Sequence, residues 1–322
     1  MLRRGLATLL ALVCLAQAAD AQTRPARLPI PRTLAVHLKA DAGQGSDIPD
    51  VEVEEIRAAV TMERKDLNGD GVPELFVEGT RFCGTNCERW IYRQLGVGGY
   101  SLLYHDWGTG ETVLPERAHG WPLITEYTHM SCCEGGTHLY RFDGRHYAWR
   151  SSVEQATRDD GTDSIIYRVA LTPSRAERPR SLVLDPAHAG GGLLVSARYD
   201  LCARGSAASC GVPVLLLQSA RLPAGRVCVD VHAMDGNRWE YKPPPGPGWC
   251  GVTAPAGGPR GEPQRVLELR PSPRDWTALG FGESLEMRGP GLPGELSLDG
   301  RVALGAFVSH LDEVYTLPPS PR

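Results

Sequence analysis

Residues 66–75 read Asp-Leu-Asn-Gly-Asp-Gly-Val-Pro-Glu-Leu, and this stretch decides how the first part of the chain folds. Asp66, Asn68 and Asp70 place oxygen-bearing side chains at alternate positions, and the two glycines let the chain turn back tightly. From position 72 the chain reads Val-Pro-Glu-Leu-Phe-Val, which is typical of a strand rather than of an exiting helix. The sequence therefore predicts a tight, oxygen-rich loop that leads into a strand.

The loop carries the donors that calcium prefers, because this cation takes roughly six to eight oxygen ligands from a flexible loop. The predicted ligands are the side chains of Asp66, Asn68, Asp70 and Glu74 and the backbone carbonyl of Val72. A plain hairpin turn is the alternative, since Asn-Gly and Asp-Gly are strong turn dipeptides. Without a cation, three carboxylates would repel one another at short range. Calcium is therefore the favoured interpretation.

The same residues resemble the calcium loops of FG-GAP and VCBS repeat proteins, in which the loop joins two strands and the ninth position carries an acid. An EF-hand would instead place a bidentate Glu at the twelfth position, which is Val77 here. The run from Asp66 to Tyr147 also resembles a class of small exported bacterial domains. The shared features are this loop, a cysteine-bounded segment before Trp-Ile-Tyr-Arg, and a closing Tyr-Arg-Phe-Asp-Gly. The resemblance to the FG-GAP and VCBS loops implies the same four side-chain ligands, and the resemblance to the exported domains supports a fold rather than a function.

Residues 1–21 have the features of a signal peptide, with Arg3 and Arg4 ahead of an apolar run and small residues at a cleavage site. The run is shorter than the about 20 residues that cross a bilayer. We expect no transmembrane segment after cleavage and a periplasmic or secreted location. The formal net charge of −4 gives no reason to expect a nucleic-acid partner, which would favour a basic face.

Cysteine usage agrees with export, because nine cysteines less Cys14 of the signal peptide leave eight, an even number. The predicted disulfide cysteines are Cys83, Cys87, Cys132, Cys133, Cys202, Cys210, Cys228 and Cys250. In the second half, the simplest pairs join each cysteine to its neighbour in sequence. In the first half we expect cross-pairing of the first two with the adjacent pair, since a bond between adjacent cysteines strains the peptide. A zinc site made of these four thiolates is the alternative, and the oxidising compartment favours disulfides.

Turn and strand signals predict a mainly β chain with two domains. The predicted parts are a signal peptide over 1–21, a flexible lead-in over 22–46, an α+β domain over 47–152, a linker over 153–163 and a β domain over 164–322. The first domain is expected to hold a helix from about Asp47 to Ala59, followed by an antiparallel strand meander. The second is expected to be a sandwich or a jelly roll. Its expected strands include Arg301 to His310, and Tyr241 to Gly261 is expected as a long loop.

Catalytic motifs are missing from the sequence, which has no Gly-x-Ser-x-Gly, no His-Glu-x-x-His and no Gly-x-x-x-x-Gly-Lys. The first hypothesis is a non-enzymatic binding module whose partner is an envelope protein or a carbohydrate. Trp239, Tyr241 and Trp249 flank a proline-rich loop and are the candidate ligand-binding residues, although large aromatic residues also contribute to burial.

An envelope hydrolase acting on glycan or peptide is the alternative function. Its carboxylate site would lie in the second domain, where Glu286, Asp299, Asp312 and Glu313 are the acids available. A thiol nucleophile beside His129 or His138 would need a reduced cysteine. The separation of two carboxyl groups across a cleft would distinguish an enzyme from a binding module.

Overall fold

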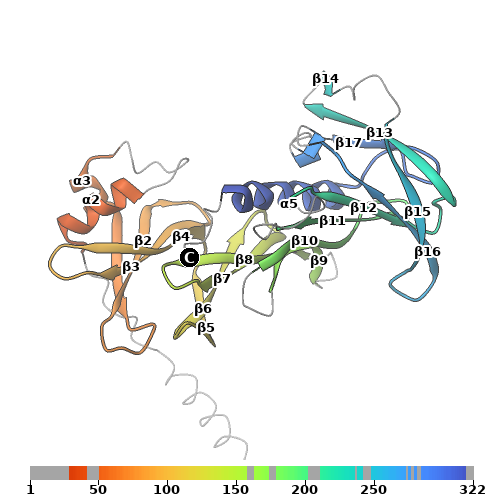
Figure 1. Cartoon of the computed structure of the whole chain (residues 1–322). Coiled ribbons are helices and arrows are strands. Elements are labelled where there is room, and N and C mark those ends of the chain that lie inside the picture. The colour runs from red at the N-terminus through yellow and green to blue at the C-terminus, as the bar shows by residue number, and fades with distance from the viewer. Residues whose placement is uncertain are drawn as a thin grey trace, which may run out of the picture. The chain divides into compact units, whose positions relative to one another are not determined.

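The computed structural model describes residues 29–41, 51–157, 163–173, 179–201, 211–235, 238–241, 248–272, 275–276, 279–280 and 284–316. The predicted signal peptide and the Cys202–Cys210 pair lie outside these ranges. The chain divides into an N-terminal unit that ends at Trp107 and a C-terminal unit that begins at Gly108. Strands dominate both units and helices precede the first strand (Figure 1). The predicted mainly β class is confirmed.

In the N-terminal unit, helices pack against a four-stranded sheet whose strands follow chain order. The elements are α2 (Arg32–Asp41), α3 (Val53–Ala59), β1 (Val60–Lys65), β2 (Glu74–Cys83), β3 (Cys87–Gln94) and β4 (Tyr100–Gly108). Met62, Val77 and Trp90 lie side by side on three neighbouring strands and are all buried. Leu34 and Leu38 of α2 complete this core.

Helix α2 lies within residues 22–46, which the sequence predicts as a flexible lead-in, so that prediction is wrong. Leu34, Ala35 and Leu38 recur at helical spacing and are fully buried. The surrounding proline-rich and alanine-rich composition hides this short apolar face. The next helix, α3, ends at Ala59 as predicted and begins only at Val53, later than expected from Asp47.

The oxygen-rich loop joins β1 to β2. Lys65, the last residue of β1, pairs with Glu74, the first residue of β2, so residues 66–73 close an antiparallel connection. The prediction that a strand follows the loop is therefore confirmed. Glu74 is held at the base of the loop by the register of the two strands.

In the described residues of the C-terminal unit, thirteen strands form one hydrogen-bonded sheet. The order is β14-β13-β15-β16-β12-β11-β10-β9-β8-β7-β6-β5, and β17 pairs with β13. The strands are β5 (Glu111–Ala118), β6 (Trp121–His129), β7 (Glu134–Phe142), β8 (Tyr147–Thr157), β9 (Asp163–Pro173), β10 (Pro179–His188), β11 (Leu194–Asp200), β12 (Val214–Ser219), β13 (Gly225–Asp235), β14 (Arg238–Tyr241), β15 (Trp249–Gly257), β16 (Pro263–Leu269) and β17 (Ser284–Arg288). Their apolar side chains share one core.

The boundary between the units differs from the predicted linker over residues 153–163. Strand β8 continues to Thr157, and this residue pairs with Asp163 at the start of β9. Strands β8 and β9 are therefore antiparallel neighbours in one sheet rather than elements of two domains. Polar composition alone does not distinguish a hairpin connection from a linker between domains.

Strand β15 runs through the segment from Tyr241 to Gly261, which the sequence predicts as a long loop, so that prediction is wrong for this part. Its pairing with β13 and β16 places the strand inside the sheet. A Cβ atom at Gly251 would lie against the Glu268 carbonyl oxygen, so glycine permits a close approach of the two backbones. Glycine here allows strand pairing rather than marking a turn.

Helix α5 (Leu298–Thr316) occupies the segment from Arg301 to His310, which the sequence predicts as a strand. Ala303, Leu304, Phe307, Val308 and Leu311 are buried and follow a helical period. The helix packs against β9, β10 and β11 (Figure 1). Ser297 precedes it, with the Gly300 amide donating to the Ser297 Oγ atom at 3.3 Å, an N-cap contact. The strand prediction failed because a dense run of apolar residues is compatible with the two-residue period of a strand as well as with the 3.6-residue period of a helix.

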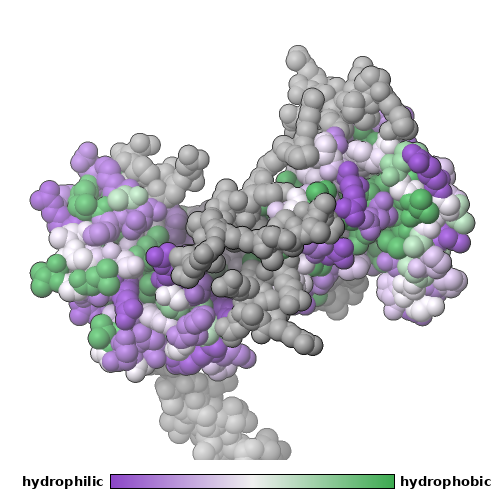
Figure 2. All heavy atoms as spheres, viewed as in Figure 1, coloured by the Kyte–Doolittle hydropathy of each residue, from purple (hydrophilic) through white to green (hydrophobic). Residues whose placement is uncertain are grey.

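The surface seen in Figure 2 intersperses hydrophilic and hydrophobic residues over both units. Exposed large apolar side chains in the described residues include Val97, Trp107 and Val252. Among the described helices, none combines the length and the apolar character that a membrane crossing requires.

Candidate functional site

Asp66 organises the turn of the oxygen-rich loop. Its Oδ1 atom accepts a hydrogen bond from the Gly69 amide at 2.8 Å, and its Oδ2 atom accepts one from the Gly71 amide at 2.9 Å. Gly69 and Gly71 have φ values of +80° and +84°, a region that favours glycine because it lacks a Cβ atom. The alternating Asp and Gly residues therefore determine the loop conformation locally.

Asn68 and Asp70 extend this network. The Asn68 Oδ1 atom accepts from the Asp70 amide, and the Asn68 Nδ2 group donates to Asp70 Oδ2, each at 2.8 Å. Asp70 Oδ1 accepts from the Val72 amide at 2.8 Å. The Val72 and Asn68 donors, with the nearby Arg93 guanidinium, hold the pKa of Asp70 below its usual value. Asp70 is therefore an ionised carboxylate at neutral pH.

Glu74 differs from the other acids of the loop because it is buried, with only 1% of its surface exposed. Its Oε2 atom accepts a hydrogen bond from the Leu67 amide at 2.9 Å. Its Oε1 atom is buried and has no hydrogen-bond partner among the described residues. Burial raises the pKa of Glu74, and the negative charges of Asp70 and Asp66 raise it further. One side-chain oxygen at the base of the loop therefore lacks a donor.

These side chains fit a calcium ion by chemistry, since an ionised carboxylate has about four lone-pair sites and can ligate while it accepts amide hydrogen bonds. A cation would also give Glu74 Oε1 the partner that it lacks. Among the described residues, no choice of one carboxylate oxygen from each of Asp66, Asp70 and Glu74 brings all three oxygens within 4.8 Å of one another. The loop as described is therefore open, and a bound cation would draw the three acids inward.

The structure places two disulfides in the described residues, Cys83–Cys87 and Cys228–Cys250. Cys228 and Cys250 face each other on β13 and β15, so that predicted pair is confirmed. The predicted cross-pairing of Cys83 and Cys87 with the adjacent cysteines is wrong. The turn between β2 and β3 sets Cys83 directly opposite Cys87, and they bond to each other.

The alternative zinc site is not formed either, because the Cys83 and Cys87 sulfurs are bonded together. Glu78 lies close to these two sulfurs. Within the described residues, Glu78, Cys83 and Cys87 therefore form a group whose potential ligand atoms lie close enough together to hold a metal ion. Oxidised sulfurs are not thiolate ligands, so this cluster does not hold a metal in the disulfide form.

A second polar cluster surrounds Ser152 of β8, which sequence reasoning missed. Ser152 is 1% exposed, and its Oγ atom lies 2.7 Å from His138 Nδ1, 2.8 Å from Trp149 Nε1 and 3.1 Å from His310 Nε2. The His310 ring stacks on Trp149 with ring centroids 3.8 Å apart. The cluster ties β7, β8 and α5 together.

The hydrogen-bonding capacity of Ser152 restricts the protonation of both histidines. A hydroxyl has one O–H donor and two acceptor lone pairs. Because Trp149 Nε1 can only donate, one histidine nitrogen must donate to Ser152 Oγ while the other accepts from it. A Ser–His contact can activate a nucleophile, but the burial of Ser152 closes this hydroxyl to a substrate. The cluster is therefore a packing element of the unit.

Two buried acids accompany this cluster. Glu126 lies opposite His138 in the β6–β7 register, is fully buried and accepts from the Gly110 amide at 2.8 Å. Glu154 is 3% exposed, and burial raises its pKa although Tyr167 hydrogen-bonds to it. The sequence does contain a signal for such buried acids. Glu126 lies two positions after the buried Ile124 on the same strand, so the alternation of a strand places both on the same face of the sheet.

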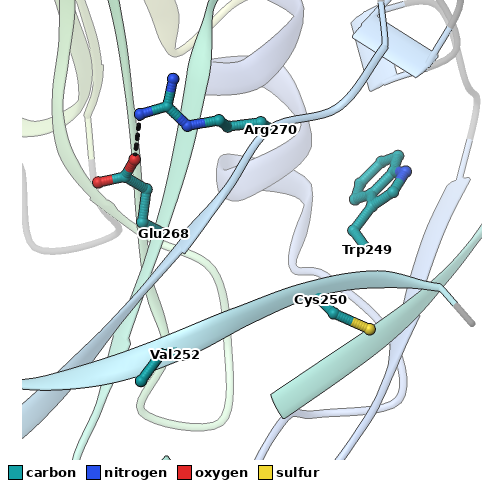
Figure 3. Close-up of a pocket in the computed structure, with 5 residues that line it drawn as sticks. All are labelled: Trp249, Cys250, Val252, Glu268 and Arg270. Atoms are coloured by element: carbon teal, nitrogen blue, oxygen red, sulfur yellow. Dashed lines mark hydrogen bonds and ion pairs between the residues drawn. The ribbon is translucent and has the colours of Figure 1, made fainter. Parts of the chain in front are cut away.

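Of the predicted ligand-binding aromatics, Trp249 is half-buried and packs against the core. Its indole N–H group donates to Asp275 Oδ2 at 3.2 Å. Trp249 lines an open cavity of 390 Å³ with Cys250, Val252, Glu268 and Arg270. Figure 3 shows the Glu268–Arg270 ion pair, 2.7 Å long, on the same side of β15 as the indole. Trp239 and Tyr241 belong to β14.

The acids of the hydrolase alternative occupy different elements. Glu286 lies on β17 and forms a two-pronged ion pair with Arg288, at 2.9 Å for each contact. Asp299 is exposed in the first turn of α5. Asp312 and Glu313 lie in the last turns of the same helix. The four acids therefore come from two elements, and the ion pair with Arg288 occupies both side-chain oxygens of Glu286.

Comparisons of the chain with protein-family models, with curated proteins and with solved structures find no match. The functional assignment therefore depends on the chemistry of the residues described above.

Proposed function

We propose that the protein is an exported, disulfide-bonded binding module, without catalytic activity, whose N-terminal unit is stabilised by calcium. The observation that carries the metal assignment is the buried Glu74 Oε1 atom, which has no hydrogen-bond partner among the described residues. A buried acceptor without a donor destabilises the fold by about 1–3 kcal/mol. A cation coordinated by Asp66, Asn68, Asp70, Glu74 and the Val72 carbonyl would remove that penalty.

Export is supported by the signal peptide predicted over residues 1–21 and by cysteine pairing. The Cys83–Cys87 and Cys228–Cys250 disulfides are compatible with an oxidising compartment, since disulfides are rare where thiols are kept reduced. We propose the periplasm or the medium as the location. External calcium would be available to the loop in either place.

The proposed ligand is an envelope carbohydrate or an envelope protein, with the Trp249 cavity as the candidate contact. An aromatic face beside a charged pair offers both stacking and hydrogen bonding. The Asp275 contact fixes the orientation of the indole ring. We favour carbohydrate, because the cavity combines one aromatic ring with the ion pair of Glu268 and Arg270.

Calcium binding is tested by thermal unfolding with added calcium, with added magnesium and with a chelator. Wild type should melt at a higher temperature in calcium, because a cation that binds only the folded state stabilises it by mass action. Magnesium should substitute poorly, since it requires a stricter octahedral shell. A melting temperature that responds to neither calcium nor chelator would show that the loop is a turn without a metal.

A matched pair of variants separates ligation from a general loss of charge. Asp70→Asn keeps an acceptor for the Val72 amide and removes one ligand charge, so its calcium response should be lost. Asp106→Asn is the control, because Asp106 also accepts an adjacent backbone amide, that of Trp107, and lies outside the loop. The control should keep the full calcium response. Equal responses in both variants would contradict the ligand assignment.

Ligand binding is tested with soluble glycan fragments from the cell envelope, added to wild type and to Trp249→Phe. Wild type should bind the glycan, and the variant should bind more weakly because the larger ring and its N–H group are lost. The glycan should be recovered unchanged after prolonged incubation, which distinguishes a binding module from a hydrolase. Cleavage of the glycan would overturn the non-enzymatic assignment.

A further inference from the structure

The turn between β6 and β7 presents two adjacent thiols at the surface. Cys132 and Cys133 are both exposed, and their Sγ atoms lie 2.9 Å apart. The Met130 and Ser131 amides both donate to the Glu134 carbonyl, at 3.0 and 3.2 Å, and close the turn. The four other cysteines within the described residues already form two disulfides. The adjacent pair is thus a separate sulfur site.

We propose that Cys132 and Cys133 form a reversible redox site that alternates between a dithiol and a disulfide between neighbouring residues. The co-reactant is a disulfide of a small thiol. One cysteine thiolate attacks that disulfide, forming a mixed disulfide and releasing one small thiolate. The second cysteine thiolate then attacks the first Sγ atom and expels the other small thiolate. Two cysteine protons are released and taken up by the two small thiolates, and the cysteines lose two electrons.

Strain should make this disulfide easy to reduce. A bond between adjacent cysteines closes a small ring that contains the peptide bond between them, and that peptide prefers to be planar and trans. Strained and exposed disulfides are more oxidising than structural ones and exchange more readily. Cys228 and Cys250, by contrast, face each other across two paired strands, where the bond closes no such ring. The two pairs should therefore differ in reduction potential.

Oxidation would also change contacts that hold the turn. The Cys133 carbonyl accepts a hydrogen bond from the Thr157 amide at 2.7 Å, and the Cys133 amide donates to Ser131 Oγ at 3.3 Å. Ser131 Oγ lies 3.3 Å from Glu134 Oε2. Ring closure turns the peptide between the two cysteines, which carries the Cys133 amide, so the contact of this amide with Ser131 Oγ should weaken. The redox state of the thiols would thus change the hydrogen bonding of the turn.

The test equilibrates the whole protein in buffers of graded reduced and oxidised glutathione, with dithiothreitol buffers for the more reducing poises, followed by rapid alkylation and peptide mass analysis. The peptide that contains Cys132 and Cys133 should change from two alkyl groups to none in a single two-electron transition. The change should occur at a less reducing poise than the reduction of Cys228–Cys250. Hydrogen exchange at the Cys133 amide should be faster in the oxidised form.

Cys133→Ser provides the matched variant, because it keeps the size of the side chain and removes one partner. Its remaining thiol should be alkylated at every poise that leaves the Cys228–Cys250 bond intact. Three results would overturn the proposal. The first is a disulfide from Cys132 or Cys133 to Cys202 or Cys210. The second is that both thiols stay reduced in the oxidising buffer. The third is that the Cys132–Cys133 disulfide is reduced only at the same poise as Cys228–Cys250 or at a more reducing one.

Discussion

Replacing Glu74 by Gln should reverse the order of stability between wild type and variant when calcium is added. The substitution keeps the size of the side chain and an oxygen that can accept from the Leu67 amide, and it removes the buried charge. In calcium-free buffer at neutral pH the variant should be more stable, because it removes a buried negative charge that Asp70 and Asp66 repel. The expected gain is at the lower end of about 1–3 kcal/mol, because the Gln amide that replaces Oε1 is itself buried without a partner.

The pH dependence of this effect has a definite sign. Burial, with the charges of Asp70 and Asp66, raises the pKa of folded Glu74 above its ordinary value of 4.5. The folded state therefore binds the proton more tightly than the unfolded state does, and the ionised carboxylate destabilises the fold. In calcium-free buffer this penalty is present above the folded pKa and is relieved as pH falls through it. Glu74→Gln should lack this part of the pH dependence.

Calcium should invert both results. At a free calcium concentration about 100 times the dissociation constant, a cation specific to the folded state adds about 2.7 kcal/mol to wild type. The variant has lost one ligand charge and should gain much less. Protons then compete with the cation for Glu74, so the stability of calcium-loaded wild type should fall on acidification.

The assay is hydrogen exchange of peptides from β2 and β3, followed by mass spectrometry, because the chain has two units and exchange reports the stability of each segment separately. Glu55→Gln serves as the control, since Glu55 is an exposed carboxylate of α3 in the same unit. It should leave the calcium response unchanged. If Glu74→Gln destabilises the unit equally with and without calcium, Glu74 is only the partner of the Leu67 amide, and the reasoning fails.

Three further predictions concern the C-terminal unit. His310→Phe keeps a ring on Trp149 but removes the nitrogen that contacts Ser152 Oγ, so it should lower the melting temperature, measured by thermal unfolding at neutral pH, whereas the exposed control His188→Gln should not. Phe307→Ala removes a fully buried ring of α5 and should lower the free energy of unfolding by about 3–5 kcal/mol, measured by urea titration. Reduction of Cys228–Cys250, whose residues lie 22 positions apart, should cost about 3 kcal/mol, read from the same titration with and without reductant.

The reason for the His310 effect lies in the capacity of Ser152. Its hydroxyl has one O–H donor and two acceptor lone pairs, which Trp149, His138 and His310 together use. Replacing the His310 imidazole takes one partner away from a buried hydroxyl. A His310→Phe protein that is as stable as wild type would contradict this account.

The oxygen-rich loop was predictable because its structure is local. Asp66 accepts from amides three and five residues ahead, and Gly69 has the positive φ that its residue type favours. Most strand positions were also predictable, since turn residues mark their ends. Strand β2 begins at Glu74, within the Val-Pro-Glu-Leu-Phe-Val stretch that predicts a strand.

The failures concern features that depend on neighbours distant in sequence. Strand β15 is a strand because β13 and β16 lie on either side of it, and its glycines and prolines resemble a loop when read alone. The Ser152 cluster joins residues up to 158 positions apart, so no local sequence pattern predicts it. Cys83 pairs with Cys87 because of a strand register that cysteine spacing does not contain.

Two buried carboxylates of this chain illustrate how burial alone does not define a metal site. Glu154 Oε2 and Glu74 Oε1 both lack a hydrogen-bond partner among the described residues, and burial raises both pKa values. Glu154 lies beside Tyr167, which hydrogen-bonds to it, so a proton can neutralise it in place. Glu74 lies at the base of an exposed loop whose Asp70 has a lowered pKa and remains charged. A proton on Glu74 would leave Asp66 and Asp70 beside the one guanidinium of Arg93, which lies 3.6 Å from Asp70, whereas a divalent cation would offset two of the three carboxylate charges, and this difference favours calcium at the loop.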